Sequence, residues 1–310
     1  MNASPPVFPA GRGICGAGDF PALFFFALER GQSMKPFLRR TAYTGPVQAV
    51  ILDWAGTTVD HGCRGPVAVF SRAFERHGIR PEVVEVRAPM GREKREHVQT
   101  MLAMPRLAGL WREEYGGDPD EAATDAVFAA VQELMPETLA DYATPVPGCV
   151  EAIADLRDMG VKIGSCTGYS RDMMVRLMPR AETAGYKPDA VVTADEVPQG
   201  RPWPWMCYLN CMRLGVHPPE AVIKAGDTLA DVEEGINAGH WSVGVTRTSN
   251  ALGLTAEETA DLPADELCRR EEELGRAFRE AGAHYVISSI ADLPALVDVI
   301  NARLARGEHP

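Results

Sequence analysis

Asp53 is the first residue along the chain whose type and position could carry out chemistry. It follows the apolar run of residues 47–52 and precedes a turn of small residues, 55–58. A carboxylate beside the backbone amides of such a loop can act as a metal ligand and as a nucleophile. On its own, the same pattern is also typical of an aspartate that only caps a helix or a turn.

A second acidic segment contains Asp227 and Asp231, in the sequence Gly-Asp-Thr-Leu-Ala-Asp after the apolar run of residues 221–225. Two carboxylates four residues apart at the start of a helix could hold Mg²⁺ directly or through water. The alternative is structural, because an acidic first turn also interacts favourably with the helix dipole.

Thr167 and Gly168 form a candidate phosphate site at the end of another apolar run. A hydroxyl group and free backbone amides at the start of a helix are well suited to bind phosphate oxygens. The three segments therefore offer a nucleophile, metal ligands and a phosphate seat, although each signal is weak alone.

Six short apolar runs, separated mostly by helical patterns, predict the elements that position these side chains. Strands alternating with helices are typical of an α/β fold with a doubly wound parallel sheet. Ligands of such sheets bind beyond the carboxyl ends of the strands, where Asp53, Thr167 and Asp227 would gather. The runs are residues 47–52, 161–165, 190–193, 221–225, 241–245 and 285–287.

A helical stretch between residues 66 and 142 breaks this alternation, and Pro136 is expected to interrupt it. We expect an all-helical cap domain at residues 62–145. It would be inserted into a Rossmann-like catalytic core made of residues 47–61 and 146–310.

The first 46 residues differ from the rest of the chain. Residues 1–18 are rich in Pro, Gly and Ala and show no sustained periodicity. We expect residues 1–46 to be a poorly ordered N-terminal extension, with Met34 as an alternative start of the chain. A targeting or interaction arm is the alternative interpretation.

The composition limits the class of protein. The 310 residues are 45% hydrophobic and 24% charged, which is ordinary for a globular protein and excludes a disordered or collagen-like chain. A net charge of −12 provides no footprint for nucleic acid or an anionic membrane, and no apolar run reaches the ~20 residues of a membrane span. Seven scattered cysteines, an odd number, indicate reduced thiols and a cytoplasmic location.

The order of the chemical residues resembles the haloacid dehalogenase superfamily of phosphotransferases. The pattern consists of a strand-tip Asp53, a strand-tip Thr167, the basic residue Arg201 and the Gly-Asp-Thr-x-x-Asp segment, and it spans nearly all of residues 47–310. The resemblance implies a haloacid dehalogenase-like core in which Asp53 becomes an aspartyl-phosphate. It also implies that Mg²⁺ neutralises the phosphoryl oxygens.

Ala55 departs from the usual pattern of that superfamily. Most of its phosphatases have a second aspartate at this position, which protonates an alkoxide leaving group, and Ala55 has no acid. If the leaving group is a carbanion, it must be stabilised by delocalisation, for which a protonated imine is the usual electron sink. A lysine in the cap would be needed to form it.

Lys94 is the candidate for that lysine. It follows the loop residues Met90 and Gly91 and lies in the first turn of a predicted helix, with His97 three residues on and therefore on the same face. We expect the nearby cations Arg92 and Arg95 and the positive helix end to favour the free amine. The alternative is a solvated basic helix start.

With these motifs the resemblance narrows to the phosphonatase (phosphonoacetaldehyde hydrolase) family. The similar segments are Asp-Trp-Ala-Gly-Thr-Thr from Asp53, Met-Gly-x-x-Lys from Met90, Thr-Gly-Tyr-x-Arg-x-Met-Met from Thr167 and Gly-Arg-Pro-x-Pro-Trp-Met-Cys from Gly200. The resemblance implies cleavage of phosphonoacetaldehyde to acetaldehyde and phosphate in 2-aminoethylphosphonate degradation. It further implies a homodimer formed through the cap, while the acidic charge and the lack of a membrane span predict no nucleic acid or membrane partner.

The same resemblance implies a role for each site residue. Asp53 would be the nucleophile, Lys94 would form the Schiff base, and one Mg²⁺ per subunit would bind Asp53, the Ala55 carbonyl and Asp227. Thr167, Gly168 and Arg201 would bind phosphate, although the planar guanidinium could instead orient the nucleophilic carboxylate. Supporting positions are Asp231, Met90, Gly91, His97 as a proton shuttle, Tyr169 near the aldehyde, and Cys63 beside the pocket.

Other interpretations remain open at this point. The chain could be a phosphomonoesterase or phosphomutase of the same fold, which would turn over sugar phosphates without needing Lys94. It could also be a binding protein that lost catalysis with the acid at position 55. For Trp203 and Trp205 we expect simple packing against the sheet, and for Tyr169 and Cys63 packing is the alternative role.

Overall fold

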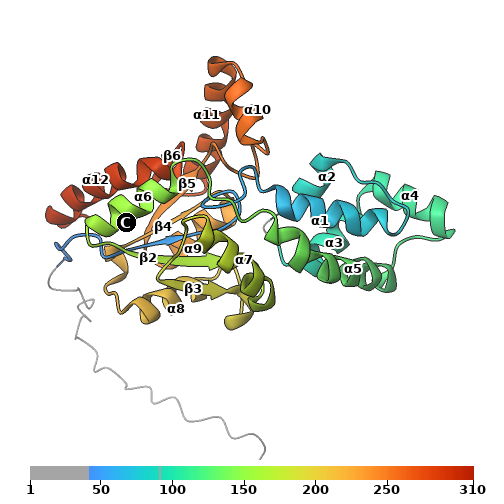
Figure 1. The fold of residues 1–310 in the computed structure, drawn as a ribbon, viewed down its shortest axis with the longest axis horizontal. Coiled ribbons are helices and arrows are strands. Elements are labelled where there is room, and N and C mark those ends of the chain that lie inside the picture. Colours follow the sequence, from blue (N-terminus) through green and yellow to red (C-terminus); the bar gives the residue numbers. More distant parts are fainter. Residues whose placement is uncertain (1–41, 91) are drawn as a thin grey trace, which may run out of the picture. The chain divides into compact units, whose positions relative to one another are not determined.

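Six parallel strands form the central sheet in the computed structural model, which describes residues 42–90 and 92–310 (Figure 1). The expected N-terminal extension therefore lies outside the described residues except for residues 42–46. The strand order is β3-β2-β1-β4-β5-β6, which confirms the doubly wound parallel sheet. The strands are β1 (Ala49–Leu52), β2 (Lys162–Thr167), β3 (Ala190–Thr193), β4 (Val222–Gly226), β5 (Trp241–Val245) and β6 (Tyr285–Ile287).

Strand β1 lies in the middle of the sheet and is buried on both faces, which explains its uninterrupted apolar sequence. Ile51 pairs with Gly164 of β2 on one side and with Lys224 of β4 on the other. The chain builds β2 and β3 on one side of β1 and then crosses over to build β4, β5 and β6 on the other. The order of the strands reverses at β1, so the residue after β1 lies where sheets of this type bind ligands.

Helices cover both faces of the sheet. Val50, Leu52 and Ile163 belong to one core cluster, which includes residues of α6 (Cys149–Asp158), α7 (Arg171–Thr183) and α12 (Leu293–Ala305). Ile51 and Cys166 point to the opposite face, where they pack with α8 (Trp205–Leu214). Helix α9 (Leu229–Asn237) packs on β4 and β5. Three short 3₁₀ helices complete the core: η1 (Ala194–Glu196), η2 (Pro219–Ala221) and η3 (Ile290–Asp292).

The segment after β1 is helical, as expected for the cap. Its helices are α1 (Arg64–Glu75), α2 (Val83–Arg87), α3 (Lys94–Leu102), α4 (Pro105–Tyr115) and α5 (Glu121–Ala140), grouped to one side of the sheet in Figure 1. Phe70 and Phe74 of α1 and Val127 and Val131 of α5 are buried where these two helices pack together, in the same apolar cluster as one face of the sheet. The helices fall within the expected limits of residues 62–145, and the domain boundaries themselves stay predictions.

The expected interruption at Pro136 is wrong, because α5 continues through it to Ala140. The proline lacks an N–H group and costs the helix one hydrogen bond, but α5 packs along its length on α1, α3 and α7, and this packing keeps the segment helical.

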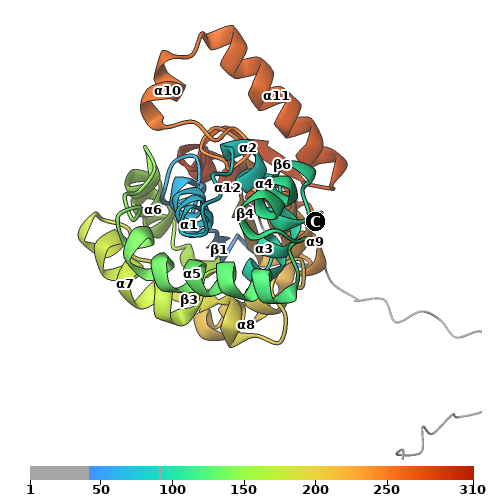
Figure 2. The same cartoon turned by 90° about the vertical axis from the view of Figure 1, so that its right-hand side faces the viewer.

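Two further helices, α10 (Ala256–Asp261) and α11 (Ala264–Glu280), project from the sheet between β5 and β6 (Figures 1 and 2). Phe278 near the end of α11 is buried, and Gly244 of β5 lies so close to its ring that a Cβ atom there would overlap it. Across residues 42–90 and 92–310, every helix is too short or too polar to cross a bilayer.

Candidate active site

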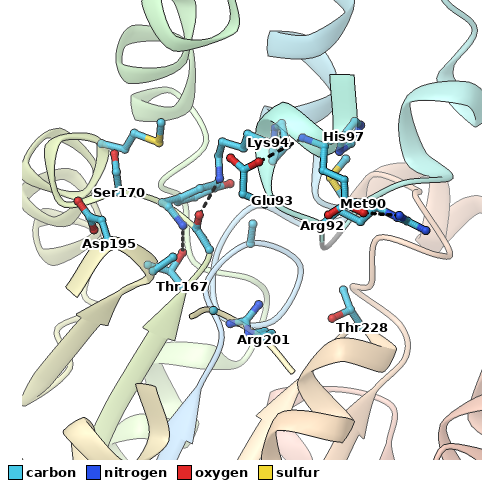
Figure 3. Close-up of a pocket in the computed structure, with 18 of the residues that line it drawn as sticks. Met90, Arg92, Glu93, Lys94, His97, Thr167, Ser170, Asp195, Arg201 and Thr228 are labelled. Atoms are coloured by element: carbon cyan, nitrogen blue, oxygen red, sulfur yellow. Dashed lines mark hydrogen bonds and ion pairs between the residues drawn. The ribbon is translucent and has the colours of Figure 1, made fainter. Parts of the chain in front are cut away.

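A cavity of about 780 Å³ lies between the carboxyl ends of the strands and the helical cap. The sheet contributes Asp53, Thr167 and Asp227 to its wall, and the cap contributes Lys94 and His97. Figure 3 shows the cap side chains facing the strand ends across this space. The structure therefore brings together residues that the sequence places on separate elements.

Asp53 follows β1 directly, and hydrogen bonds hold both its backbone and its carboxylate. Its N–H donates to the carbonyl of Ala225 at 3.0 Å, and the hydroxyl of Thr58 donates to its backbone carbonyl at 2.8 Å. Arg201 donates a short hydrogen bond from Nη2 to Oδ1 of Asp53. Burial raises the pKa of Asp53, and the guanidinium of Arg201 opposes this effect. The carboxylate is thus fixed in orientation, as a nucleophile requires.

Arg201 is buried in a network of charges beneath the nucleophile. Its Nε lies 3.1 Å from Oε2 of Glu234 and 3.1 Å from Oδ1 of Asp231, and its Nη2 also donates to the Cys166 carbonyl at 3.1 Å. Of the two expected functions of this guanidinium, orienting the nucleophilic carboxylate is the one for which the structure shows a contact.

Sequence reasoning missed Lys224 and Glu234, which complete this network. Lys224 is fully buried, and its Nζ lies 2.5 Å from Oδ1 of Asp231 and 3.4 Å from Oε2 of Glu234. The available signal was a charged residue inside an otherwise apolar strand, since buried lysines require partners. Asp231 is therefore engaged by two cations and also forms a capping box with Thr228 at the start of α9.

The acidic residues at this edge fit a divalent cation. Carboxylate oxygens of Asp53, Asp227 and Asp231 all lie within 4.8 Å of one another. Burial and the two neighbouring aspartates raise the pKa of Asp227 well above its usual range. A bound cation would relieve this repulsion, and Mg²⁺ prefers such oxygen ligands.

The balance of charge supports the same conclusion. Four carboxylates meet in the described network, and two side-chain cations, Arg201 and Lys224, oppose them. The carboxylates are those of Asp53, Asp227, Asp231 and Glu234. With all groups ionised, the deficit of two positive charges equals the charge of one magnesium ion.

The loop after the nucleophile closes tightly on Asp227. Gly56 has a φ of 83°, and a Cβ atom there would overlap Oδ2 of Asp227, so only glycine fits this approach. Thr57 donates from Oγ1 to Oδ1 of Asp227 at 3.2 Å, and the Asn250 N–H donates to Oδ2 at 2.8 Å. Ala55 lines the same cavity. The predicted metal ligands Asp53, Ala55 and Asp227 are thus neighbours, and their role stays a prediction.

Lys94 is the first residue of α3 and reaches across the cavity to the core. Glu93 caps the helix by accepting from the N–H groups of Arg95 and Glu96. The Nζ of Lys94 donates to the carbonyl of Gly168 at 2.6 Å and lies 5.3 Å from the centre of the Tyr169 ring. The amine is therefore held beside the candidate phosphate site.

The pKa of Lys94 is lowered to about 8, as expected, but the expected cause is wrong. The side chain is half-buried at the cavity wall, and desolvation there is the largest effect, with Arg201 adding a smaller repulsion. Arg92 and Arg95 instead form ion pairs within the cap, to Glu96 and to Glu121 and Asp125.

His97 lies on the same face as Lys94, as expected, and is buried in the cap wall. Its ring stacks on Phe70 with a centroid separation of 3.9 Å, and burial lowers its pKa to about 3. Its Nε2 has no hydrogen-bond partner among the described residues. At neutral pH the ring is therefore uncharged and only weakly basic, and the predicted shuttle role stays a prediction.

The remaining supporting positions line the cavity, apart from two. Met90, Cys63 and Tyr169 contribute to its wall, and burial raises the pKa values of the Cys63 thiol and the Tyr169 phenol well above their usual ranges. Both groups are therefore protonated at neutral pH. Gly91 lies outside the described residues, and Asp231 belongs to the charge network below Arg201.

Trp203 and Trp205 do not pack against the sheet, contrary to expectation. Their side chains are 49% and 39% exposed, and Trp203 lines the cavity. Helix α8 buries its opposite side, with Met206 and Cys207 in the core, so Trp205 at its first position faces outward.

Comparison with known proteins agrees with this geometry. Residues 47–239 match the family described as haloacid dehalogenase-like hydrolase. The chain is 56% identical over 277 residues to a phosphonoacetaldehyde hydrolase of Nitratidesulfovibrio vulgaris, covering 89% of this chain and 99% of the relative. It is 46% identical over 251 residues to a bifunctional phosphonoacetaldehyde hydrolase/aminoethylphosphonate transaminase of Clostridioides difficile, covering 81% of this chain and 40% of that longer protein.

A solved structure shows the same fold. The crystal structure of a phosphonoacetaldehyde hydrolase-like protein from Oleispira antarctica is 37% identical in sequence, with a TM-score of 0.83. The match covers 90% of this chain and 100% of that one.

Proposed function

Since the chain belongs to the haloacid dehalogenase-like hydrolases and, within them, to the phosphonoacetaldehyde hydrolase family, we propose that it hydrolyses phosphonoacetaldehyde to acetaldehyde and phosphate through a Lys94 Schiff base. One observation carries the mechanism: a lysine amine from the cap and a strand-tip carboxylate line one cavity. At position 55, where an oxygen leaving group would need an acid, the chain has alanine.

The first step is condensation at Lys94. The lone pair of Nζ adds to the aldehyde carbon, and loss of water leaves a protonated imine beside the carbon that bears phosphorus. The lowered pKa of Lys94, about 8, supports this step because it increases the fraction of free amine near neutral pH.

The second step is phosphoryl transfer to Asp53. A carboxylate oxygen of Asp53 attacks phosphorus, and the electrons of the breaking carbon–phosphorus bond move into the imine to form an enamine. Arg201 keeps the attacking carboxylate in place, and Thr167 and Gly168 lie on the same cavity wall as donors for phosphoryl oxygens. Asp53, Asp227 and the Ala55 carbonyl would hold Mg²⁺, which supplies positive charge against the phosphoryl oxygens.

The last steps release the products. Water hydrolyses the aspartyl-phosphate and regenerates the Asp53 carboxylate. The enamine takes a proton on carbon, and water then hydrolyses the imine to acetaldehyde and free Lys94. His97 lies on the Lys94 face of α3 and lines the same cavity, but its pKa of about 3 makes it a weak base, so its role as a proton shuttle stays a prediction.

The reaction belongs, in this proposal, to the degradation of 2-aminoethylphosphonate in the cytoplasm. The name of the Clostridioides relative, which joins the hydrolase to an aminoethylphosphonate transaminase, supports that placement. The homodimer formed through the cap also stays a prediction, which light scattering coupled to size-exclusion chromatography would test.

Borohydride trapping tests the mechanism directly. Incubation with phosphonoacetaldehyde and borohydride should inactivate the enzyme and leave a reduced adduct on Lys94, located by peptide mapping. Without borohydride, phosphate and acetaldehyde should be released in equal amounts. Turnover of sugar phosphates without an adduct would favour a phosphomonoesterase or phosphomutase, and ligand binding without any turnover would favour a binding protein.

A further inference from the structure

Arg87 joins the cap to the core loop after β5, whereas Lys94 contacts Gly168 in the loop after β2. It is the last residue of α2, and its Nη1 donates to the Gly62 carbonyl at 2.8 Å and to both the carbonyl and Oδ1 of Asn250 at 2.9 Å. Its Nη2 donates to the carbonyl of Gly253 at 3.2 Å. One guanidinium therefore binds the segment that leads into the cap and the core loop after β5.

The contact depends on the shape of the guanidinium. All four acceptors are uncharged oxygens, so the planar fork of donors, and not an ion pair, holds the two parts together. Gly253 has a φ of 67°, and a Cβ atom there would lie 2.8 Å from Cζ of Arg87. The loop thus packs directly against the side chain.

The core loop that Arg87 binds is itself tied to the catalytic residues. The Asn250 N–H donates to Asp227, and Thr248 donates from Oγ1 to the Gly56 carbonyl in the nucleophile loop at 2.5 Å. Thr248 also accepts at its carbonyl from the Gly62 N–H at 2.8 Å. Arg87 therefore anchors the cap to the part of the core that surrounds the nucleophile.

Arg87 also stands seven residues before Lys94 in the sequence. The end of α2 determines where the connection to α3 starts, and α3 begins at Lys94. We propose that Arg87 is a positioning residue for Lys94, which holds the amine at the distance from Asp53 that one substrate can span. The inference rests on the proposed function, because it assigns Arg87 to the delivery of the imine-forming amine.

Arg106 provides a matched control. It too is a cap arginine that binds near α2, through Nε to Oε1 of Glu85 at 2.8 Å and through Nη2 to the Arg80 carbonyl at 3.2 Å. Its partners lie within the cap, so its removal changes the surroundings of α2 without touching the core.

The test compares Arg87→Met, Arg87→Lys and Arg106→Gln with the wild type. The readout is the rate of borohydride trapping of phosphonoacetaldehyde on Lys94, because only a substrate whose phosphonate group is held by the core responds to the position of the amine relative to Asp53. We expect trapping to fall by about 10- to 100-fold in Arg87→Met, because a small misplacement of a reacting group has effects of this size. Arg87→Lys should be intermediate, and Arg106→Gln should equal the wild type.

A folding control separates positioning from stability. Circular dichroism and thermal unfolding identify a variant that is unfolded at the assay temperature, and millimolar guanidinium should restore trapping to folded Arg87→Met by filling the vacated site. If Arg87→Met does not fold, the trapping rate of Arg87→Lys tests the inference in its place: a rate below that of the wild type supports it, and the wild-type rate contradicts it. Trapping at the wild-type rate in a folded Arg87 variant would overturn the positioning role of Arg87 and leave the proposed function intact. Absence of trapping in the wild type would overturn the proposed function, and the inference with it.

Discussion

The Nζ of Lys94 donates a 2.6 Å hydrogen bond to the backbone carbonyl of Gly168, so the amine of the cap and the candidate phosphate seat of the core are in contact. A carbonyl partner stabilises the ammonium form, whereas burial of the side chain favours the neutral amine. Condensation with an aldehyde must replace this hydrogen bond. The carbonyl of Gly168 thus holds Lys94 beside the position where the phosphoryl group binds in our proposal.

Replacing Lys94 by arginine tests whether Lys94 acts covalently. Lys94→Arg keeps the positive charge but cannot form the imine, so phosphate release from phosphonoacetaldehyde should fall to near background. A lysine acting only through its charge would tolerate arginine with a loss of one or two decades, about 1.4 kcal/mol each. Near wild-type turnover by this variant would refute the Schiff-base mechanism.

Asp53→Asn separates the two covalent residues. The amide cannot carry phosphate, so turnover should cease, while Lys94 can still condense with the aldehyde. Mass spectrometry after borohydride reduction should therefore find the adduct on Asp53→Asn and not on Lys94→Arg. Equal labelling of both variants would show that another lysine is the electron sink.

The rate of imine formation should depend on pH through the titration of Lys94. Its pKa of about 8 lies below the usual 10.5, so only the fraction of enzyme with a neutral amine reacts. Trapping should rise about tenfold per pH unit below 8 and level off above it. Cyanoborohydride trapping with acetaldehyde between pH 6 and 10 measures this profile, and a free alkylamine treated in the same way shows the pH dependence of the reagents themselves. A rise that continues to pH 10 would contradict the lowered pKa of Lys94.

Removal of divalent cations should stop phosphoryl transfer but leave imine formation at Lys94 unaffected. A chelator should stop phosphate release, because Asp53 and Asp227 would then repel the anionic substrate, and added Mg²⁺ should restore it. Trapping of acetaldehyde, which lacks a phosphonate group, should continue in the chelator. Undiminished phosphate release in excess chelator would exclude the proposed metal.

Lys224→Met tests the buried charge network through stability. The change leaves Asp231 and Glu234 without the ammonium that they share, and all three side chains are completely buried. The free energy of unfolding should fall by about 3 kcal/mol or more. Urea unfolding at pH 7 measures it, with Arg269→Met, which breaks exposed ion pairs on α11, as a control whose stability should change little. An equal, small loss in both variants would mean that Arg201 alone balances the carboxylates.

The strands and the residues at their tips were accessible from sequence because both depend on local pattern. The apolar runs predicted every strand of the described sheet, and the topology of parallel sheets then placed Asp53, Thr167 and Asp227 at one edge. The start of α3 at Lys94 followed in the same way from the loop that precedes it.

The supporting contacts were not accessible, since they join positions far apart in the chain. Arg87 meets Asn250 across 163 residues, and no local pattern marks either residue. The lowered pKa of Lys94 likewise depends mainly on desolvation between cap and core, whereas sequence shows only its neighbours Arg92 and Arg95. The exposure of Trp203 and Trp205 was not accessible either, because hydrophobicity alone does not indicate which side of α8 faces the sheet at Trp205, or that Trp203, in the loop before α8, lines the cavity.

The central place of β1 in the sheet also matters during synthesis on the ribosome. This strand is made before either of its neighbours: β2 emerges only after the whole helical insertion, and β4 only after β3 and α8. At an elongation rate of about 5–20 residues per second, both edges of β1 remain unpaired for on the order of ten seconds. The cap is one continuous segment of the chain, so it can fold in that time. A nascent chain with a folded cap and an exposed Ala-Val-Ile-Leu strand presents an unpaired apolar edge that chaperones bind. Substitutions that make β1 more prone to aggregate would therefore lower the yield of folded enzyme without changing the activity of the molecules that do fold.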